Sequence, residues 1–229
     1  LRILEADDTF KILFVGRIVR NKCQSDLLRV ADRLRRMTGR PIRLTLAGGL
    51  GADAAYRDGL FALCEELGLQ ACIEFAGKVD DPRLRALYRG SDVFLCLSEH
   101  EGFCVPIVEA MQYDLPVVAY AASAVPETMG DGGLLLDDKN PGRVAAALKV
   151  LSEEPELRRR LVRAGRRNVL RFSRARSLHG LARFLRDRLD IQILVPATPP
   201  EPTVTDQPAR WRVEGPFDNS YSLALVNLS

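Results

Sequence analysis

Short apolar runs alternate with amphipathic stretches from about residue 10 to residue 136. Lys11 to Val15 is an apolar run that ends at Gly16, which is typical of a buried strand. From Asp26 to Met37 the apolar residues recur every three or four positions, which predicts a helix. The chain therefore opens with a strand-loop-helix unit.

The same unit repeats along the chain. Further strands are predicted over Ile42 to Ala47, Cys72 to Phe75, Val93 to Leu97, Pro116 to Tyr120 and Leu134 to Leu136. Helices are predicted between them over Ala54 to Leu67, Pro82 to Arg89 and Pro106 to Tyr113. Because parallel strands need crossover connections, this alternation favours a parallel sheet with helices on both faces. The expected fold class is a doubly wound, Rossmann-like α/β domain.

Helices alone are predicted after Leu136, and they close the domain near residue 190. They span Arg143 to Leu151, Glu156 to Leu170 and Arg174 to Leu189. Arginine is frequent from residue 158 to residue 188, which allows a membrane or nucleic-acid surface. Helical patterning instead favours a solvated arginine face, and we expect no nucleic-acid partner. The matching core face would consist of Leu157, Leu161, Val169, Leu170 and Phe172.

Residues 10–190 therefore form the main predicted domain. Residues 1–9 are expected to lead in from a preceding domain, since the sequence starts without Met or a signal-peptide pattern. Residues 191–210 are expected to be a linker, because Pro196 to Pro208 contains five prolines and no periodicity. Residues 211–229 are expected to open a further module, with a strand at Trp211 and a helix over Tyr221 to Leu228.

Composition adds limits on location and redox state. The 229 residues are 47% hydrophobic and 28% charged, which fits a globular protein with one large core. No apolar run approaches the roughly 18 to 20 residues of a membrane span. The odd number of cysteines, without a Cys-x-x-Cys pair, indicates reduced thiols and a cytoplasmic location. The cysteines are Cys23, Cys64, Cys72, Cys96 and Cys104.

Cationic side chains follow the first predicted strand. In doubly wound sheets, ligands bind beyond the carboxyl ends of the strands. Arg17 comes directly after Gly16, and Lys22 lies just before the next predicted helix. Two cations beside the amides of a helix start make a suitable anion site. The alternative is a pair of solvated surface side chains.

Carboxylates and free amides follow the strand Val93 to Leu97. Because proline is favoured in the first turn of a helix, Pro106 places free backbone amides at residues 102–105. Glu101 precedes these amides and Glu109 lies about one turn inside the helix, so both carboxylates can face one ligand. Alternatively, both acids complement the helix dipole. The residues with the free amides are Gly102, Phe103, Cys104 and Val105.

The turn Gly77-Lys78-Val79 follows another predicted strand. It lies at the same edge of the sheet, where its backbone can receive a flat base. A plain connecting loop is the alternative.

These segments, in this order and spacing, resemble the C-terminal domain of the family 4 (group 1) glycosyltransferases, enzymes built from two Rossmann domains in the GT-B architecture. The resemblance rests on Gly16-Arg17 with Lys22, on Phe75 to Val79, and on Glu101-Gly102-Phe103 through Pro106 to Glu109-Ala110-Met111. It extends from about residue 10 to residue 188. Its most specific part is the pair of glutamates separated by seven residues.

The resemblance implies a retaining, metal-independent glycosyltransferase. Its donor would be a nucleoside diphosphate sugar, and its acceptor a glycan or lipid-linked molecule in cell-surface polysaccharide synthesis. A preceding domain would hold the acceptor, with peripheral contact to the inner face of the membrane. No Asp-x-Asp metal triplet occurs in the chain, so no metal is expected.

The resemblance also implies roles for individual residues. Arg17 and Lys22 would hold the donor diphosphate and neutralise the leaving nucleotide. Glu101 would contact the transferred sugar, and Glu109 the ribose hydroxyls. The amides of residues 102–105 would contact phosphate and sugar oxygens. The last implied contact is that of the base with Lys78 and Val79.

One segment departs from the family pattern. Many relatives have a Gly-Gly pair before Pro-Glu, where this chain has Ala121-Ala122-Ser123-Ala124-Val125-Pro126-Glu127. We therefore assign no donor contact to that loop.

Two other functions remain open. Gly49-Leu50-Gly51-Ala52-Asp53-Ala54 fits a loose dinucleotide-binding fingerprint, with Glu74 at about the right distance, which would indicate an NAD(P)-binding oxidoreductase domain. However, Glu74 falls inside its predicted strand, and the fingerprint follows the second strand. The second alternative is a non-catalytic module that binds a nucleotide sugar.

Overall fold

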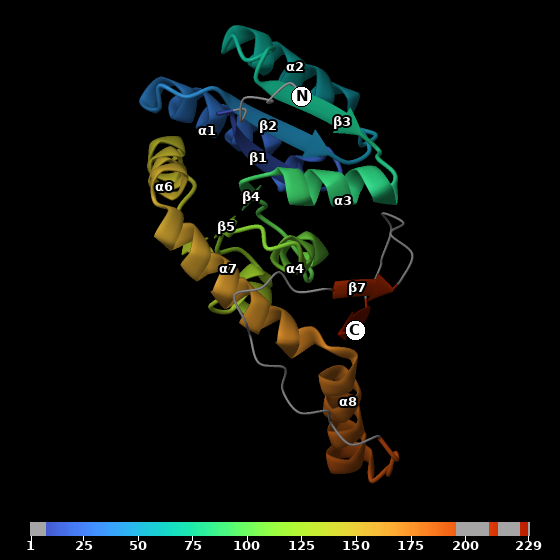
Figure 1. The fold of residues 1–229 in the computed structure, drawn as a ribbon. Helices are drawn as coiled ribbons and strands as arrows, with labels where there is room; N and C mark the ends of the chain where they lie inside the picture. The colour runs from blue at the N-terminus through green and yellow to red at the C-terminus, as the bar shows by residue number, and fades with distance from the viewer. Residues whose placement is uncertain (1–7, 196–210, 215–224, 229) are drawn as a thin grey trace.

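The sheet is six-stranded and parallel throughout. The computed structural model describes residues 8–195, 211–214 and 225–228. The strand order is β3-β2-β1-β4-β5-β6 (Figure 1). The strands are β1 Phe10–Val15, β2 Ile42–Ala47, β3 Ile73–Gly77, β4 Val93–Cys96, β5 Val117–Tyr120 and β6 Leu134–Leu136. Because the chain builds outward from β1 in one direction and from β4 in the other, the predicted doubly wound fold is confirmed.

Helices connect the strands and close the domain, mostly where the sequence predicts them. They are α1 Gln24–Met37, α2 Ala54–Glu66, α3 Asp81–Gly90, α4 Val105–Gln112, α5 Val125–Met129, α6 Pro141–Glu153, α7 Pro155–Val169 and α8 Arg174–Leu189. Two 3-10 turns, η1 Arg20–Lys22 and η2 Leu170–Phe172, accompany them. The short α5 and η1 were not predicted.

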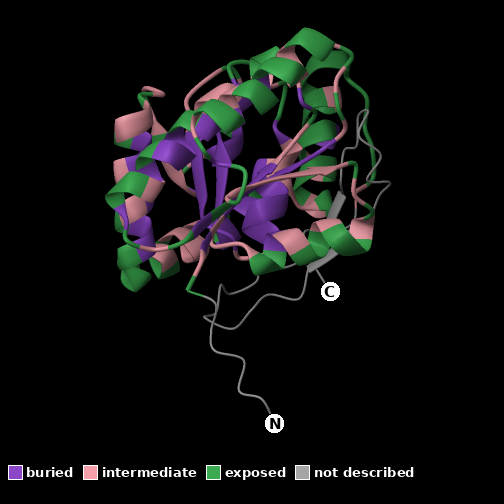
Figure 2. Ribbon diagram, turned by 90° about the horizontal axis from the view of Figure 1, so that it is seen from above, coloured by how far each residue is buried: buried purple, intermediate pink, exposed green. Residues whose placement is uncertain are grey.

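Apolar side chains on both faces of the sheet pack against a layer of helices. In β1, Phe14 packs with buried residues of α1, α2 and α6, whereas Leu13 packs with α3, α4 and α5 on the opposite face. This follows from the two-residue period of a strand. Figure 2 shows the buried strands at the centre and the exposed helix surfaces outside them. The core therefore lies on both faces of the sheet, and loops at the strand ends are left for ligands.

The arginine-rich helix α7 turns its apolar side inward, as predicted. Val169 is buried, and Leu157 and Leu161 are partly buried against the core. Arg166 is the exception to the solvated arginine face. It is buried, and its Nε lies 2.6 Å from Oδ1 of Asp114, in the turn after α4. This ion pair links α7 to the helical layer that contains α4.

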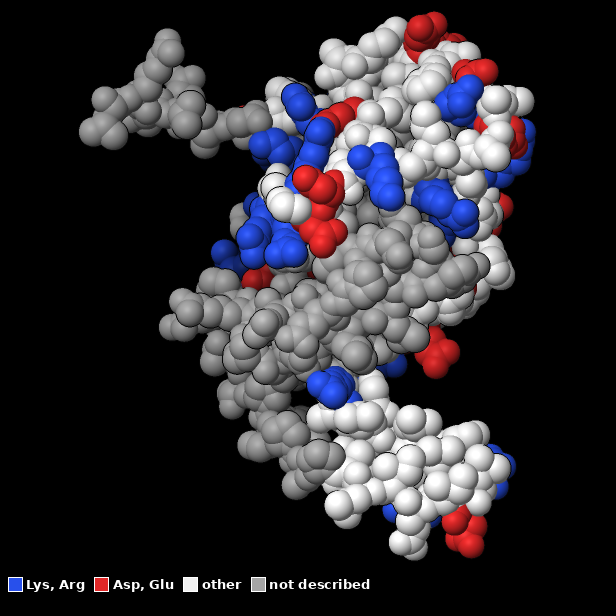
Figure 3. All heavy atoms as spheres, turned by 90° about the vertical axis from the view of Figure 1, so that its right-hand side faces the viewer, with Lys and Arg blue, Asp and Glu red and all other residues white. Residues whose placement is uncertain are grey.

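The last helix, α8, extends away from the sheet at the lower end of the domain as drawn in Figure 1. It leaves several apolar side chains exposed, and Ala182 is its one buried residue. On the side shown in Figure 3, positive and negative side chains are interspersed, and the lower end is mostly uncharged. Among the helices of the described residues, none has the length and hydropathy to cross a bilayer. The exposed apolar side chains of α8 are Leu178, Leu181, Phe184 and Leu189.

One prediction for the tail is confirmed and another is wrong. β7 Trp211–Glu214 is the expected strand, but β8 Leu225–Leu228 is a strand where a helix was expected. The two strands pair antiparallel, which satisfies backbone groups that so short a helix would leave unpaired. Residues 196–210 of the predicted linker at 191–210, residues 1–7 of the predicted lead-in at 1–9, and residues 221–224 of the predicted helix lie outside the described residues.

Candidate functional site

The loops after β1 and β4 meet because these strands are neighbours in the sheet. Lys22 Nζ lies 2.6 Å from Oε1 of Glu101, and both side chains are mostly buried. The Glu99 amide donates a 2.9 Å hydrogen bond to the Asn21 carbonyl oxygen, which joins the two loop backbones. The structure thus brings together two residues that are 79 positions apart in the sequence.

Arg17 lies on the first of these loops. Its carbonyl oxygen accepts a 2.8 Å hydrogen bond from Nε2 of Gln24, a fully buried side chain at the start of α1. This bond fixes the backbone, while the guanidinium is exposed and has no partner among the residues that the structure describes. The backbone of Arg17 is therefore held in place, and its positive charge remains available to bind an anionic ligand.

The helices that follow these two loops begin without side-chain caps. Cys23 precedes α1 and Cys104 precedes α4, and both adopt the left-handed conformation with φ of 52° and 62°. In contrast, side chains cap α2, α3, α6 and α8. Within the described residues, the amides of residues 102–105 have no acceptor, as the sequence predicts. Free amides and a helix dipole favour an anion at this point.

Glu109 lies inside α4, as predicted, and it is buried. Its Oε2 accepts a 2.7 Å hydrogen bond from the hydroxyl of Tyr88, a fully buried residue of α3. Burial raises the pKa of the Glu109 carboxyl, the Tyr88 hydrogen bond opposes this shift, and the Asp81 carboxylate adds to it. No pattern along the chain indicates the Tyr88 contact. A contact between Glu109 and ribose stays a prediction.

The raised pKa predicts a pH-dependent stability. Because the folded pKa of Glu109 lies above its ordinary value of 4.5, protonation stabilises the folded state. This stabilisation is complete below pH 4.5 and is lost as pH rises through the folded pKa. Glu109→Gln removes the buried charge and keeps an acceptor for Tyr88, so it should raise the melting temperature at neutral pH. Each kcal/mol corresponds to about 2 to 4 °C.

Melting curves of parent and variant from pH 4.5 to neutrality measure this difference. The gain should shrink toward acid pH. A variant that melts below the parent at every pH would show that the ionised carboxylate is required by the fold.

Lys78 and Val79 follow β3, at the edge of the same sheet. Lys78 is exposed, and Val79 is partly buried against the core layer that also contains Cys104 and Val108. Among the described residues, Lys78 has no hydrogen-bond or ion-pair partner. The turn lies at the expected edge, and its contact with a base stays a prediction.

Further loops complete the frame of the site. Lys139, after β6, lies 2.7 Å from Glu99 and 3.0 Å from Asp26 of α1. Although burial by itself lowers the pKa of Lys139, these two carboxylates raise it overall. The Ala124 amide, in the loop that departs from the family pattern, donates to the Glu101 carbonyl oxygen at 3.4 Å. These contacts join separate segments, so helix and strand patterning gives no sign of them.

Gly51 of the dinucleotide-like fingerprint has a structural explanation. The loop after β2 packs against the loop after β1, and the Gly51 amide donates a 3.1 Å hydrogen bond to the Ile18 carbonyl oxygen. A Cβ at Gly51 would collide with that oxygen. Asp53 caps α2 by accepting from the Tyr56 amide, and Glu74 lies inside β3, as predicted. This geometry favours backbone packing as the reason for Gly51, whereas a Cβ at Gly49 would meet no other atom within 4 Å.

The chain resembles glycosyltransferases in sequence. The family described as glycosyl transferases group 1 matches residues 2–168. D-inositol 3-phosphate glycosyltransferase of Corynebacterium kroppenstedtii is 31% identical over 182 residues, 78% of this chain and 40% of that protein. The Mycolicibacterium smegmatis protein of the same name is 33% identical over 174 residues, 74% of this chain and 38% of that protein. The chain thus spans about 40% of the length of such relatives.

Solved structures agree with this relationship. The C-terminal domain of LpcC, a group 1 family glycosyl transferase from Francisella tularensis, is 26% identical with a TM-score of 0.63. The alignment covers 70% of this chain and 84% of that domain. Anabaena HepE, solved with UDP and glucose, shares the fold at 22% identity and a TM-score of 0.69, over 79% of this chain and 49% of that one. This chain belongs to the group 1 glycosyl transferases.

Proposed function

We propose that this chain is the donor-binding half of a retaining glycosyltransferase that works without a metal ion. The observation that carries the proposal is the unneutralised Arg17 guanidinium on the same loop as Lys22, opposite the free amides before α4. Such a set of positive groups suits a diphosphate. The donor in this proposal is a nucleoside diphosphate sugar.

The proposed chemistry is electrostatic. As the sugar leaves, negative charge develops on the diphosphate, and fixed positive groups stabilise it most at that stage. Arg17 and Lys22 supply this charge, while the amides of residues 102–105 bind phosphate and sugar oxygens. Glu101 then faces the transferred sugar with its carboxylate oriented by Lys22, 2.6 Å away. Glu109 is proposed to hold the ribose, and Lys78 with Val79 to line the base.

We place the acceptor site outside this chain, which spans about 40% of the length of its relatives. In our proposal a preceding domain presents a glycan or lipid-linked acceptor, in the cytoplasm and beside the inner face of the membrane. Cell-surface polysaccharide synthesis fits such an acceptor. The relatives named for D-inositol 3-phosphate make a small phosphorylated alcohol a second acceptor class to test. UDP, present in the HepE structure, is a first ligand to test.

Calorimetry with UDP, GDP and ADP tests the proposal directly. We expect one of these nucleotides to bind the full chain in EDTA with an affinity that magnesium leaves unchanged, because side chains and amides supply the positive charge. Binding that disappears in EDTA and returns with magnesium would contradict metal-independent recognition. No binding of any nucleotide in either buffer would contradict the donor site itself.

A further inference from the structure

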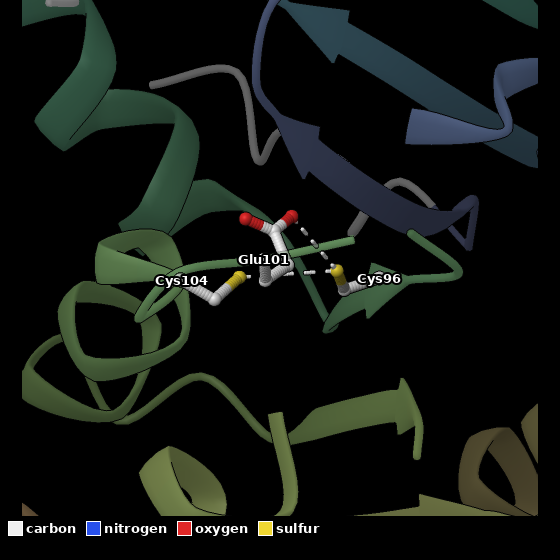
Figure 4. Close-up of side chains that lie close together, drawn as sticks. All are labelled: Cys96, Glu101 and Cys104. Carbon is white, nitrogen blue, oxygen red and sulfur yellow. Dashed lines mark hydrogen bonds between the residues drawn. The ribbon is translucent and has the colours of Figure 1, made fainter. Parts of the chain in front are cut away.

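Two cysteines and the glutamate of the proposed sugar site converge beneath the loop before α4 (Figure 4). Cys96 ends β4, Cys104 precedes α4, and Glu101 lies between them in the loop. The Cys96 and Cys104 sulfurs are 3.9 Å apart, and the Cys96 sulfur is 4.0 Å from Oε1 of Glu101. All three ligand atoms lie within 4.8 Å of one another. Cys96 belongs to β4, whereas Glu101 and Cys104 belong to the loop that joins β4 to α4.

These separations are close to those of a zinc site. Zinc binds thiolate sulfur at about 2.3 Å and carboxylate oxygen at about 2.0 to 2.2 Å in a tetrahedron. Two sulfurs on such a tetrahedron are about 3.8 Å apart, close to the observed 3.9 Å. A sulfur and an oxygen would be about 3.5 Å apart, so the Glu101 oxygen would move about half an ångström closer to the Cys96 sulfur and up to about 1.3 Å closer to the Cys104 sulfur. Three protein ligands leave the fourth position for water or a ligand oxygen.

The charges of the site also suit a divalent cation. Two thiolates and a carboxylate carry three negative charges, which zinc and Lys22 together balance. Lys22 Nζ already lies 2.6 Å from Glu101. The hydroxyl oxygen of buried Ser98 lies 3.4 Å from the Cys96 sulfur and can donate to it once that sulfur is a thiolate. Such a neighbouring donor orients a metal ligand.

We propose that Cys96, Glu101 and Cys104 form a binding site for a thiophilic divalent cation such as zinc. Binding forms two metal–sulfur bonds and one metal–oxygen bond and releases two thiol protons to solvent, without a change of oxidation state. The metal takes the Glu101 carboxylate away from the transferred sugar. Zinc therefore inhibits transfer and weakens binding of the donor sugar; this consequence rests on the proposed function.

Cobalt is the probe for the site, because cobalt bound by thiolates has a charge-transfer absorption in the near ultraviolet. We expect the reduced full chain, free of other metals and oxygen, to bind one cobalt ion with this absorption, and zinc to displace it. Cys96→Ser and Cys104→Ser should each weaken binding by more than about tenfold, because even loss of a residue that only hydrogen-bonds a metal ligand costs about that much. Cys72→Ser is the matched control, since this partly buried thiol lies outside the cluster and its loss should leave the absorption unchanged.

Melting curves first establish that each variant is folded. Glu101→Gln provides a second test, because it keeps both thiols. We expect it to lower the affinity for cobalt as much as the cysteine variants do. No thiolate absorption in the parent, or absorption that survives in both cysteine variants, would overturn the proposal. Loss of two hydrogens from the cysteines without bound metal would identify a disulfide pair and would also overturn it. UDP binding in EDTA separates this outcome from failure of the donor site, because it needs no metal.

Discussion

Arg17→Ala and Lys22→Ala should each weaken binding of a nucleoside diphosphate by about 1.5 to 3 kcal/mol, roughly 10- to 150-fold, with little effect on a nucleoside. Each variant removes charge-assisted hydrogen bonds to phosphate. We expect the larger loss for Lys22→Ala, because its removal also leaves the Glu101 carboxylate, 2.6 Å away, without its partner and repelling the diphosphate. Calorimetry with matched nucleoside and nucleoside diphosphate measures both effects.

Arg33→Ala is the matched control for these two variants. Arg33 is an exposed residue of α1, so its loss changes the net charge by the same amount away from the site. Its effect on diphosphate binding should be small. Equal losses for the nucleoside and the diphosphate in Arg17→Ala and Lys22→Ala would instead show that these side chains support the fold.

Glu101→Gln, made in the complete parent enzyme, should lower kcat on the order of a hundredfold, the effect of removing one preorganised group. The free nucleoside diphosphate should bind at least as tightly as before, because Lys22 loses an ion-pair partner and stays available to phosphate. The distinction follows from differential binding: a group that touches only the reacting sugar stabilises the transition state more than the bound nucleotide. Steady-state kinetics and calorimetry together measure it.

Glu99→Gln is the control for this substitution. Glu99 lies two residues earlier in the same loop, but its ion-pair partner is Lys139 and not Lys22. It should retain most of the turnover. Full turnover in Glu101→Gln, at an unchanged melting temperature, would show that the proposed role of Glu101 is wrong.

Local sequence patterns predicted most of the scaffold. β2 has the predicted bounds, and α4 begins one residue before the predicted Pro106, because apolar periodicity and proline act over a few neighbouring residues. The five-residue α5 is too short to show a helical period. β8 was mistaken for a helix because its strand conformation depends on pairing with β7. The pattern within one segment does not show which strand that segment pairs with.

The same distinction applies to the site. The order of strands places the loops of Arg17, Lys22 and Glu101 at one edge, and this could be predicted from the topology alone. The Tyr88–Glu109 hydrogen bond depends on how α3 packs beside α4, and no spacing along the chain indicates it. The cysteine cluster was missed for a similar reason. Cys96 and Cys104 are eight positions apart, and the left-handed residue before α4 turns the second sulfur toward the first.

Amide NMR spectra of the full chain, recorded in EDTA during titration with UDP, GDP or ADP, test the central claim most directly. The account predicts that one nucleotide shifts the amides of residues 16–22 and 102–105 most strongly, since these groups surround the proposed diphosphate position. The Gly48 to Gly51 loop, which is held by backbone packing, should shift less. The largest shifts at that loop and the start of α2, with residues 102–105 unchanged, would contradict a donor site between β1 and β4.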